Sequence, residues 1–268
     1  MRTVYLGTSD FAVTVLRCLA ASEHRPALVV TRPDRPKGRG RRLSPPPVAE
    51  AVRELGIELL QPDSVNADEA REAIAAVRPE VVCICAYGAL IKEPLLHDYE
   101  MLNVHPSLLP RWRGAAPVER AILAGDEETG VSIMKVVKEL DAGPIAAQRA
   151  FPIAPDDDAG AVYARAADVA VQLLHDVLPN QTFCEQEGEV TYAEKLTAAD
   201  RDLDLSQPED ALRRIRALSP HIGARAELHG RPVTIWRATL EGGTLAPLEV
   251  QPEGRRRMTY EEFARGLR

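Results

Sequence analysis

The sequence predicts an α/β protein in which a mostly parallel sheet, covered by helices on both faces, precedes a small β-rich module. Over about the first 150 residues, short apolar runs alternate with helical patterns, which is typical of parallel sheets with crossover helices. Near residue 182 the chain becomes polar and weakly periodic, and beyond residue 205 short alternating strand patterns follow one helix. We therefore expect a main domain at 1–181, a linker at 182–205 and a C-terminal domain at 206–268.

The strands of the main domain are expected where short apolar runs occur, at 3–7, 27–31, 57–61, 81–87, 101–105 and 131–137. Its helices are expected at 10–21, 46–55, 67–77, 115–124 and 157–178. Ser9 or Asp10 can cap the first helix, and Asn66 or Asp68 the third. In the C-terminal part, a helix at 209–218 precedes the strand patterns RAELHG, VTIWRATL and LAPLEVQ, which favour a small β-barrel or sheet.

Composition excludes several classes of protein. The apolar content of 45% and charged content of 27% are typical of a globular protein. The N-terminus RTVYLGTSDF has no signal-peptide pattern, and no apolar run reaches about eighteen residues, so we expect a cytoplasmic protein without membrane contact. Cys83 and Cys85 have no partner pair at metal-ligand spacing and are expected to be buried thiols. The histidines also lack ligand spacing, so no metal is expected.

Charge is distributed unevenly along the chain. The net charge of −7 argues against a protein that coats nucleic acid non-specifically, because such a protein gains its affinity by neutralising phosphates. Residues 32–42 nevertheless carry six basic residues against the single Asp34. Such a run is most often only solvated, and its glycines and prolines disfavour a helix, but it can also order around an anionic partner such as RNA.

The strongest candidates for chemistry lie at the end of the run MLNVH. Asn103 and His105 stand two residues apart, so both side chains leave one face of an extended strand, and Pro106 ends that strand. Asp141, in the turn-forming LDAGP, can supply a carboxylate from a separate loop. A lone histidine would more often be structural, and GTSDF has only Gly7 of the three glycines that a dinucleotide fingerprint needs.

Together these segments resemble the formyltransferase family that uses 10-formyltetrahydrofolate. The shared segments, as they stand in this chain, are GTSDF (7–11), the basic stretch 29–48, AYGALI (86–91), NVHPSLLPRWRGAAPV (103–118), ELDAGP (139–144), TYAEK (191–195) and LEVQPEGRRRM (248–258). The basic insertion and the C-terminal domain indicate the branch of the family that formylates the α-amino group of charged methionyl-initiator tRNA.

The resemblance implies a Rossmann-like formyltransferase domain followed by a small OB-like β-barrel domain, with 10-formyltetrahydrofolate as co-substrate and no metal. The implied catalytic residues are Asn103, His105 and Asp141. The implied folate-binding residues are Ser107, Leu108, Leu109, Pro110, Tyr87, Leu90 and Ile91. The implied tRNA-binding residues are Arg35, Lys37, Arg39, Arg41, Arg42, Arg255 and Arg256. We expect a monomer that meets the acceptor-stem end of the tRNA.

Two departures from the family pattern concern the C-terminal part. It is shorter than the family's usual barrel, through a deletion between VTIWRATLEGG and TLAPLEVQ, and SPHIGA (219–224) stands where an N-P-W-P-like segment is expected. The closest rival function is formylation of a nucleotide-linked amino sugar by the same three catalytic residues. A rival of another class is a non-catalytic RNA-binding protein on an enzyme scaffold.

Overall fold

The computed structural model describes residues 1–37 and 42–267. Its contacts divide the chain into two compact units, one made of 1–113, 130–150 and 165–190 and the other of 114–129, 151–164 and 191–268. Three elements run across this division: β9 (Glu128–Lys135), β10 (Ile145–Pro152) and α6 (Ala159–Val177). The domain and linker boundaries expected from the sequence remain predictions.

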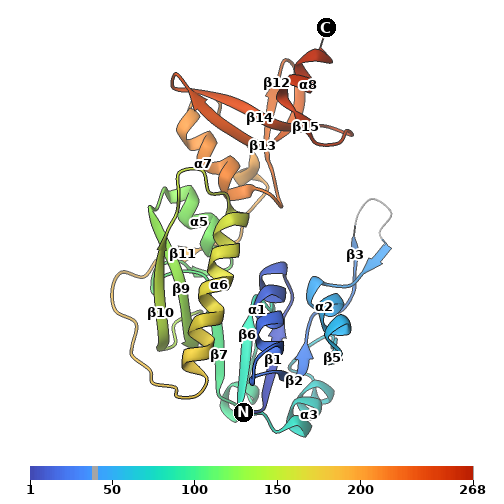
Figure 1. Cartoon of the computed structure of the whole chain (residues 1–268), viewed down its shortest axis with the longest axis vertical. Helices are drawn as coiled ribbons and strands as arrows, with labels where there is room; N and C mark the ends of the chain where they lie inside the picture. Colours follow the sequence, from blue (N-terminus) through green and yellow to red (C-terminus); the bar gives the residue numbers. More distant parts are fainter. Residues whose placement is uncertain (38–41, 268) are drawn as a thin grey trace. The chain divides into compact units, whose positions relative to one another are not determined.

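A seven-stranded sheet organises the first unit, in the order β10-β9-β7-β6-β1-β2-β5 (Figure 1). Five neighbouring strands run parallel, and β9 is antiparallel to β7. These five are β1 (Thr3–Gly7), β2 (Pro26–Val30), β5 (Glu58–Leu60), β6 (Val81–Cys85) and β7 (Met101–His105). The mostly parallel sheet and its six expected strands are thus confirmed. The chain leaves β1 toward β2 and β5 and later returns to β6 and β7, so the strand order reverses between β1 and β6.

Burial explains why the central strands were readable from the sequence. Every residue of β1 and of β6 is buried, so both faces of the sheet are covered at its centre. Gly7, at the end of β1, lies so close to Tyr5 and Ala12 that a Cβ atom there would overlap them. The apolar core around these strands consists of Val4, Leu6, Leu28, Val30, Val65, Ile74, Val82, Ile84, Tyr87, Ile91, Leu95 and Met101.

The expected helices form within a few residues of their expected ends. They are α1 (Asp10–Ala20), α2 (Pro47–Leu55), α3 (Asp68–Val77), α5 (Pro117–Ala124) and α6, joined by the short α4 (Leu95–Asp98). Ser9 caps α1 by accepting from the backbone N–H of Ala12. The expected cap of α3 is wrong, because its N-cap is Ala67 and makes no side-chain bond. Asn66 is engaged elsewhere, donating to the Leu90 carbonyl and accepting from the Lys92 N–H.

The basic segment contributes two short strands that the sequence did not predict. β3 (Arg35–Lys37) and β4 (Arg42–Ser44) pair antiparallel, with Arg35 opposite Ser44. Residues 38–41 lie outside the described residues. The expectation that this segment is not helical agrees with the two strands.

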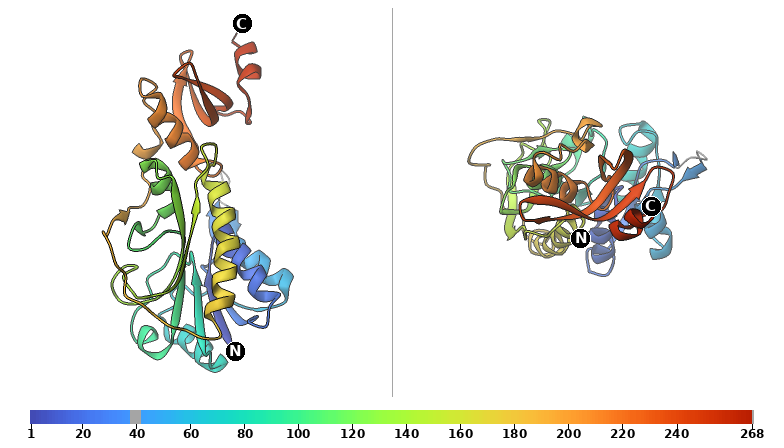
Figure 2. Two further views of the ribbon diagram at one scale, coloured as in Figure 1. Left: turned by 60° about the vertical axis from the view of Figure 1, so that its left-hand side comes forward. Right: turned by 90° about the horizontal axis from the view of Figure 1, so that it is seen from above.

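The C-terminal part of the second unit is an antiparallel sheet packed with two helices (Figure 2). The strand order is β12-β13-β14-β15. Gly242 and Gly243, both with positive φ, form the tight turn that joins β13 directly to β14. The elements are α7 (Pro208–Leu218), β12 (Ala224–Leu228), β13 (Arg231–Glu241), β14 (Thr244–Pro252), β15 (Met258–Thr259) and α8 (Tyr260–Arg265). The predicted helix and three strands are confirmed, whereas α8 was not foreseen.

Short elements complete the chain. β8 (Arg113–Gly114) pairs with β11 (Tyr192–Ala193), and a single 3₁₀ turn covers Ala199–Arg201. β11 and the 3₁₀ turn lie in the segment expected to be a linker. None of the helices that the structure describes is long and apolar enough to cross a membrane.

Candidate active site

Asn103 and His105 alternate along β7 and therefore leave the same face of the strand, as the sequence predicted. β7 lies between β6 and β9, with Asn103 opposite Ile84 on one side and Met134 on the other. The strand ends at His105. Both side chains therefore lie near the carboxyl edge of the parallel strands, where open α/β sheets bind ligands.

His105 is enclosed, with 4% of its surface exposed. Its Nε2 lies 2.8 Å from the carbonyl oxygen of Trp112, and its Nδ1 lies 3.7 Å from Oδ2 of Asp141. A carbonyl and a carboxylate can only accept hydrogen bonds, so the ring satisfies both neighbours when both of its nitrogens carry a proton. The structure thus brings His105 and Asp141 together and adds Trp112, which the sequence did not indicate.

Asn103 differs from His105 in having an uncommitted side chain. It is half-buried, and its amide makes no hydrogen bond to any residue in the described part of the chain. Because both nitrogens of the neighbouring imidazole already face acceptors, the Asn103 NH₂ is the donor that is available to a ligand. The site therefore combines one free amide donor with an imidazole held beside a carboxylate.

Asp141 takes its place through a strained, closely packed loop. Its φ of +46° lies in the left-handed region, which costs a non-glycine residue roughly 1–2 kcal/mol. At Gly143 a Cβ atom would overlap the carbonyl oxygen of Lys135, so only glycine allows the loop to pack against the end of β9. The Lys135 N–H donates to the Pro144 carbonyl at 2.9 Å and fastens the loop there.

The segment Ser107–Pro110, expected to bind folate, is anchored mainly by buried bonds. The Ser132 hydroxyl donates to the Ser107 carbonyl at 2.7 Å and accepts from the Leu109 N–H at 3.2 Å. Leu109 packs with Met134 and Ile145 in a small apolar cluster. Ser107, Leu109 and Pro110 are buried and Leu108 is half-buried, so mainly backbone and Leu108 remain for contact with a ligand.

The other three expected folate residues do not share one surface. Leu90 is 68% exposed, whereas Ile91 belongs to the apolar core beside Leu95. Tyr87 is buried and lines a different hollow. The structure therefore does not gather the side chains of the 86–91 segment into one binding wall.

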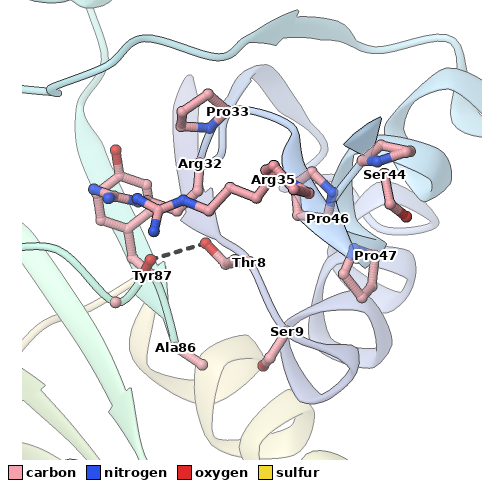
Figure 3. Close-up of a pocket in the computed structure, with 13 residues that line it drawn as sticks. Thr8, Ser9, Arg32, Pro33, Arg35, Ser44, Pro46, Pro47, Ala86 and Tyr87 are labelled. Atoms are coloured by element: carbon pink, nitrogen blue, oxygen red, sulfur yellow. Dashed lines mark hydrogen bonds between the residues drawn. The ribbon is translucent and has the colours of Figure 1, made fainter. Parts of the chain in front are cut away.

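The hollow that Tyr87 lines is a pocket of about 440 Å³ at the carboxyl ends of β1 and β6, where the strand order reverses (Figure 3). The Thr8 hydroxyl donates to the Tyr87 carbonyl at 2.8 Å. The Tyr87 hydroxyl has no hydrogen-bond partner among the described residues. Burial raises the pKa of Tyr87, and the nearby Arg32 charge opposes that rise. The pocket has a basic rim, because Arg32 and Arg35 both line it.

This pocket and the Asn103–His105 pair lie on the same edge of one sheet. β6 stands between β1 and β7, and neighbouring strands are about 4.8 Å apart, so the ends of β6 and β1 that line the pocket are roughly 5–10 Å from β7 across the sheet. Arg32 and Arg35 follow β2, which is three strands, or roughly 14 Å, from β7. Within the described residues, no cluster of three or more His, Cys, Asp or Glu side chains could hold a metal ion. The edge therefore presents polar groups, a carboxylate and cationic side chains to a ligand.

Comparison with known proteins identifies the family. The formyl transferase family model matches residues 1–178, which include Asn103, His105 and Asp141. The methionyl-tRNA formyltransferase of Methylococcus capsulatus is 39% identical over 98% of this chain and 96% of its own length. That of Thermus thermophilus is 44% identical over 99% of this chain and 96% of its own length. This chain belongs to the methionyl-tRNA formyltransferase family.

The solved structures agree with this assignment at the level of fold. A methionyl-tRNA formyltransferase from Clostridium thermocellum is 16% identical, with a TM-score of 0.69 over 94% of this chain and 98% of its own. The alignments with the two sequence relatives run to 295 and 294 positions, more than the 268 residues of this chain. Those methionyl-tRNA formyltransferases therefore carry residues that this chain lacks, and the direct Gly242–Gly243 turn fits the shortening expected there.

In this formyltransferase the residues expected to bind tRNA lie in both units. Arg35 and Lys37 belong to β3 and Arg42 to β4, while Arg39 and Arg41 lie outside the described residues. Arg255 and Arg256 are exposed in the turn that follows β14. Arg256 approaches Glu262 at 3.9 Å, and the Arg255 carbonyl accepts from the Gln251 amide at 2.9 Å.

Several residues that build the site carry no recognisable motif. Ser132 and Gln148 tie the Ser107–Pro110 segment to β9 and β10, the Gln148 amide donating to both the Leu109 carbonyl and the Ser132 hydroxyl. Gln186, in the segment expected to be a linker, bonds to the Asp141 loop. A serine or glutamine alone predicts no role, so only the fold reveals these contacts.

Proposed function

We propose that this chain transfers the formyl group of 10-formyltetrahydrofolate to the α-amino group of methionyl-initiator tRNA. The observation that carries the proposal is the grouping of Asn103, His105 and Asp141 at the carboxyl edge of the sheet. Two relatives named methionyl-tRNA formyltransferase, aligned over nearly the whole chain, support the choice of acceptor.

The chemistry demands groups of these kinds. The nitrogen lone pair of the uncharged amine attacks the formyl carbon, and the carbonyl π electrons move to oxygen to form a tetrahedral oxyanion. Collapse re-forms the carbonyl and breaks the bond to N10 of the folate. The amine must lose a proton, and the departing N10 gains one. The site thus needs a donor for the oxyanion and a group that handles protons.

We assign the oxyanion to the Asn103 amide, which is uncommitted in the structure. One preorganised donor of this kind contributes roughly 3–4 kcal/mol to the transition state. His105 acts as the second donor once substrate displaces the Trp112 carbonyl from Nε2. Asp141 lies beside Nδ1 of the imidazole and passes the amine proton to solvent.

We place the folate donor against the backbone of residues 86–91 and 107–110 and the loop that carries Asp141. A flat heterocycle requires an apolar slot with a few fixed backbone groups. The hydrogen bonds of Ser132 hold the Ser107–Leu109 backbone in one conformation, which suits such a slot. Leu108 is the side chain of that segment left for apolar contact.

We assign the acceptor end of the tRNA to the pocket beside Tyr87. Its two arginines, Arg32 and Arg35, suit a phosphate, and its 440 Å³ holds a nucleotide fragment. β2, which precedes both arginines, is three strands from the β7 of Asn103, and this separation of roughly 14 Å leaves room for a ribose and an ester between phosphate and amine. The remaining basic residues, namely Lys37, Arg39, Arg41, Arg42, Arg255 and Arg256, would add contacts to the RNA backbone.

We further propose that residues 206–268 are a reduced OB-like module that docks the tRNA, joined by the linker 182–205 to a catalytic domain at 1–181. In this view the Gly242–Gly243 turn replaces the segment that longer family members carry. We expect a cytoplasmic monomer. Light scattering of the purified protein measures its molar mass and so tests the oligomeric state.

The decisive assay supplies radiolabelled formyl donor with one of three acceptors: charged initiator tRNA, charged elongator methionyl-tRNA, or a nucleotide-linked amino sugar. Formylation of the initiator tRNA at a kcat/KM at least about 100-fold above the others is the expected result. His105→Ala serves as the control for catalysis by this site. If the amino sugar is formylated in preference, the acceptor is a nucleotide-linked amino sugar and not tRNA. If the protein binds tRNA but transfers no formyl group, it is a non-catalytic RNA-binding protein.

A further inference from the structure

Gln186 makes four hydrogen bonds that use its whole side-chain amide. Its Nε2 donates to the carbonyls of Asp141 and Gly143, each at 2.8 Å. Its Oε1 accepts from Nε of Arg113 at 3.1 Å and from Nη2 at 2.6 Å. The short chain segment that carries Gln186 is itself held in place, because Cys184 and Ile145 exchange two backbone hydrogen bonds of 2.8 and 3.0 Å.

These bonds join the two backbone segments between which the His105 ring lies. Arg113 directly follows Trp112, whose carbonyl faces Nε2 of His105, and Asp141 faces Nδ1. Trp112 and Asp141 both have positive φ, +64° and +46°, although neither is glycine. Such conformations cost roughly 1–3 kcal/mol each and persist only where surrounding contacts hold them. The Gln186 amide is a contact that both segments share.

We infer that Gln186 is a positioning residue for formyl transfer, which sets the distance between Asp141 and His105 by bonding the 141–143 loop to Arg113. The inference rests on the proposed function and deepens it. Nε2 holds two carbonyls of the loop, and Oε1 faces the fork of the guanidinium, so the amide is matched to its partners at both ends. Neither alanine nor glutamate can donate to those two carbonyls.

Replacing Gln186 by alanine should therefore change catalysis more than binding. We expect Gln186→Ala to lower kcat by about 10- to 100-fold, since a shift of about 1 Å in a reacting group has an effect of that size. The KM values of both substrates should stay within about threefold. Gln186→Glu keeps an acceptor for Arg113 but loses both donors, so it should behave like the alanine variant.

A matched control distinguishes positioning from general stability. Gln172 lies on α6, and its side-chain oxygen accepts a hydrogen bond from Arg149, which is outside the Asp141 loop. Gln172→Ala should keep wild-type kcat. In an Asp141→Asn background, Gln186→Ala should lower kcat by less than a further factor of about three, because both changes act on the interaction between residue 141 and His105. Independent effects that multiply in the double variant would overturn the inference.

Amide hydrogen exchange without substrate provides a readout that does not depend on activity. Exchange in residues 139–143 should speed up in Gln186→Ala and stay unchanged in Gln172→Ala. If wild-type protein formylates no acceptor while exchange responds as expected, the proposed function fails and the bond network stands. If wild-type protein is active and Gln186→Ala matches it in kcat, Gln186 has no positioning role.

Discussion

Replacing Ser132 by alanine tests whether the Ser107–Pro110 segment owes its conformation to one buried hydroxyl. Ser132 lies on β9 opposite His105 and is fully buried. Its Oγ donates to the Ser107 carbonyl and accepts from the Leu109 N–H and from the Gln148 amide. Alanine removes all three bonds without adding bulk, so the backbone of the segment should lose its anchor to β9.

The structure sets the size of the effect. The Ser107 carbonyl and the Leu109 N–H lose a buried partner, and an unsatisfied buried group costs about 1–3 kcal/mol. Gln148 keeps its bond to the Leu109 carbonyl, so its loss is smaller. We expect Ser132→Ala to be destabilised by about 2–4 kcal/mol, which corresponds to a Tm lower by roughly 5–10 °C. The KM for the formyl donor should rise about 3- to 10-fold.

Thermal unfolding and steady-state kinetics measure the two effects together. Ser22→Ala is the control: like Ser132, Ser22 donates to a backbone carbonyl, that of Leu19, and accepts from a backbone N–H, that of His24, but it is only partly buried. Ser22→Ala should lower the free energy of unfolding by less than about 1 kcal/mol and leave the KM for the formyl donor unchanged. A Ser132→Ala protein with normal Tm and normal KM would refute the anchoring role. A lower kcat with unchanged Tm would show instead that Ser132 acts on the catalytic residues.

Three further predictions concern other parts of the chain. Asn103→Ala should lower kcat about 100- to 1000-fold with a nearly unchanged Tm, and normal turnover would remove it from the oxyanion site. Burial raises the pKa of Glu119 above 4.5, so its contribution to stability is present below that pH and is lost as pH rises through the folded-state value. Glu119→Gln should then raise Tm at pH 7 but not at pH 4; equal changes at both would contradict this. Burial raises the pKa of Cys83 and Cys85 to about 12, so at pH 8 a thiol reagent should modify exposed Cys18 long before either.

The central sheet was predictable because its evidence is local. Runs such as VVCIC and TVYLG are buried at every position, and a short apolar run needs no knowledge of its neighbours to be recognised as a strand. The pairing of Asn103 with His105 was predictable for the same reason, since alternation along one strand places both on one face. The approach of Asp141 to His105 came instead from resemblance, because no local pattern relates residues so far apart.

The remaining features depend on which segments the fold brings together. Ser9 caps its helix, but Asn66 does not, since its amide instead bonds across to Leu90 and Lys92. The resemblance grouped Tyr87, Leu90 and Ile91 as folate-binding residues, and the fold divides them between pocket, surface and core as the chain turns after β6. A short motif states which residues are near in sequence, not which way each side chain points.

Acceptor choice follows from a different part of the site than catalysis does. In the proposed mechanism an amide donor, an imidazole and a carboxylate act on the formyl group and on the amine proton, and these atoms are the same for a tRNA-linked amine and a sugar amine. Selectivity must therefore come from groups that contact the rest of the acceptor. In the first unit we propose that such groups line the pocket beside Tyr87, where Arg32 and Arg35 provide positive charge. Arg32→Ala should consequently weaken the binding of any phosphate-bearing acceptor. Replacing Arg255 and Arg256 of the second unit by alanine should weaken the binding of tRNA alone. Measuring kcat/KM for charged tRNA and for the nucleotide-linked amino sugar distinguishes the two effects.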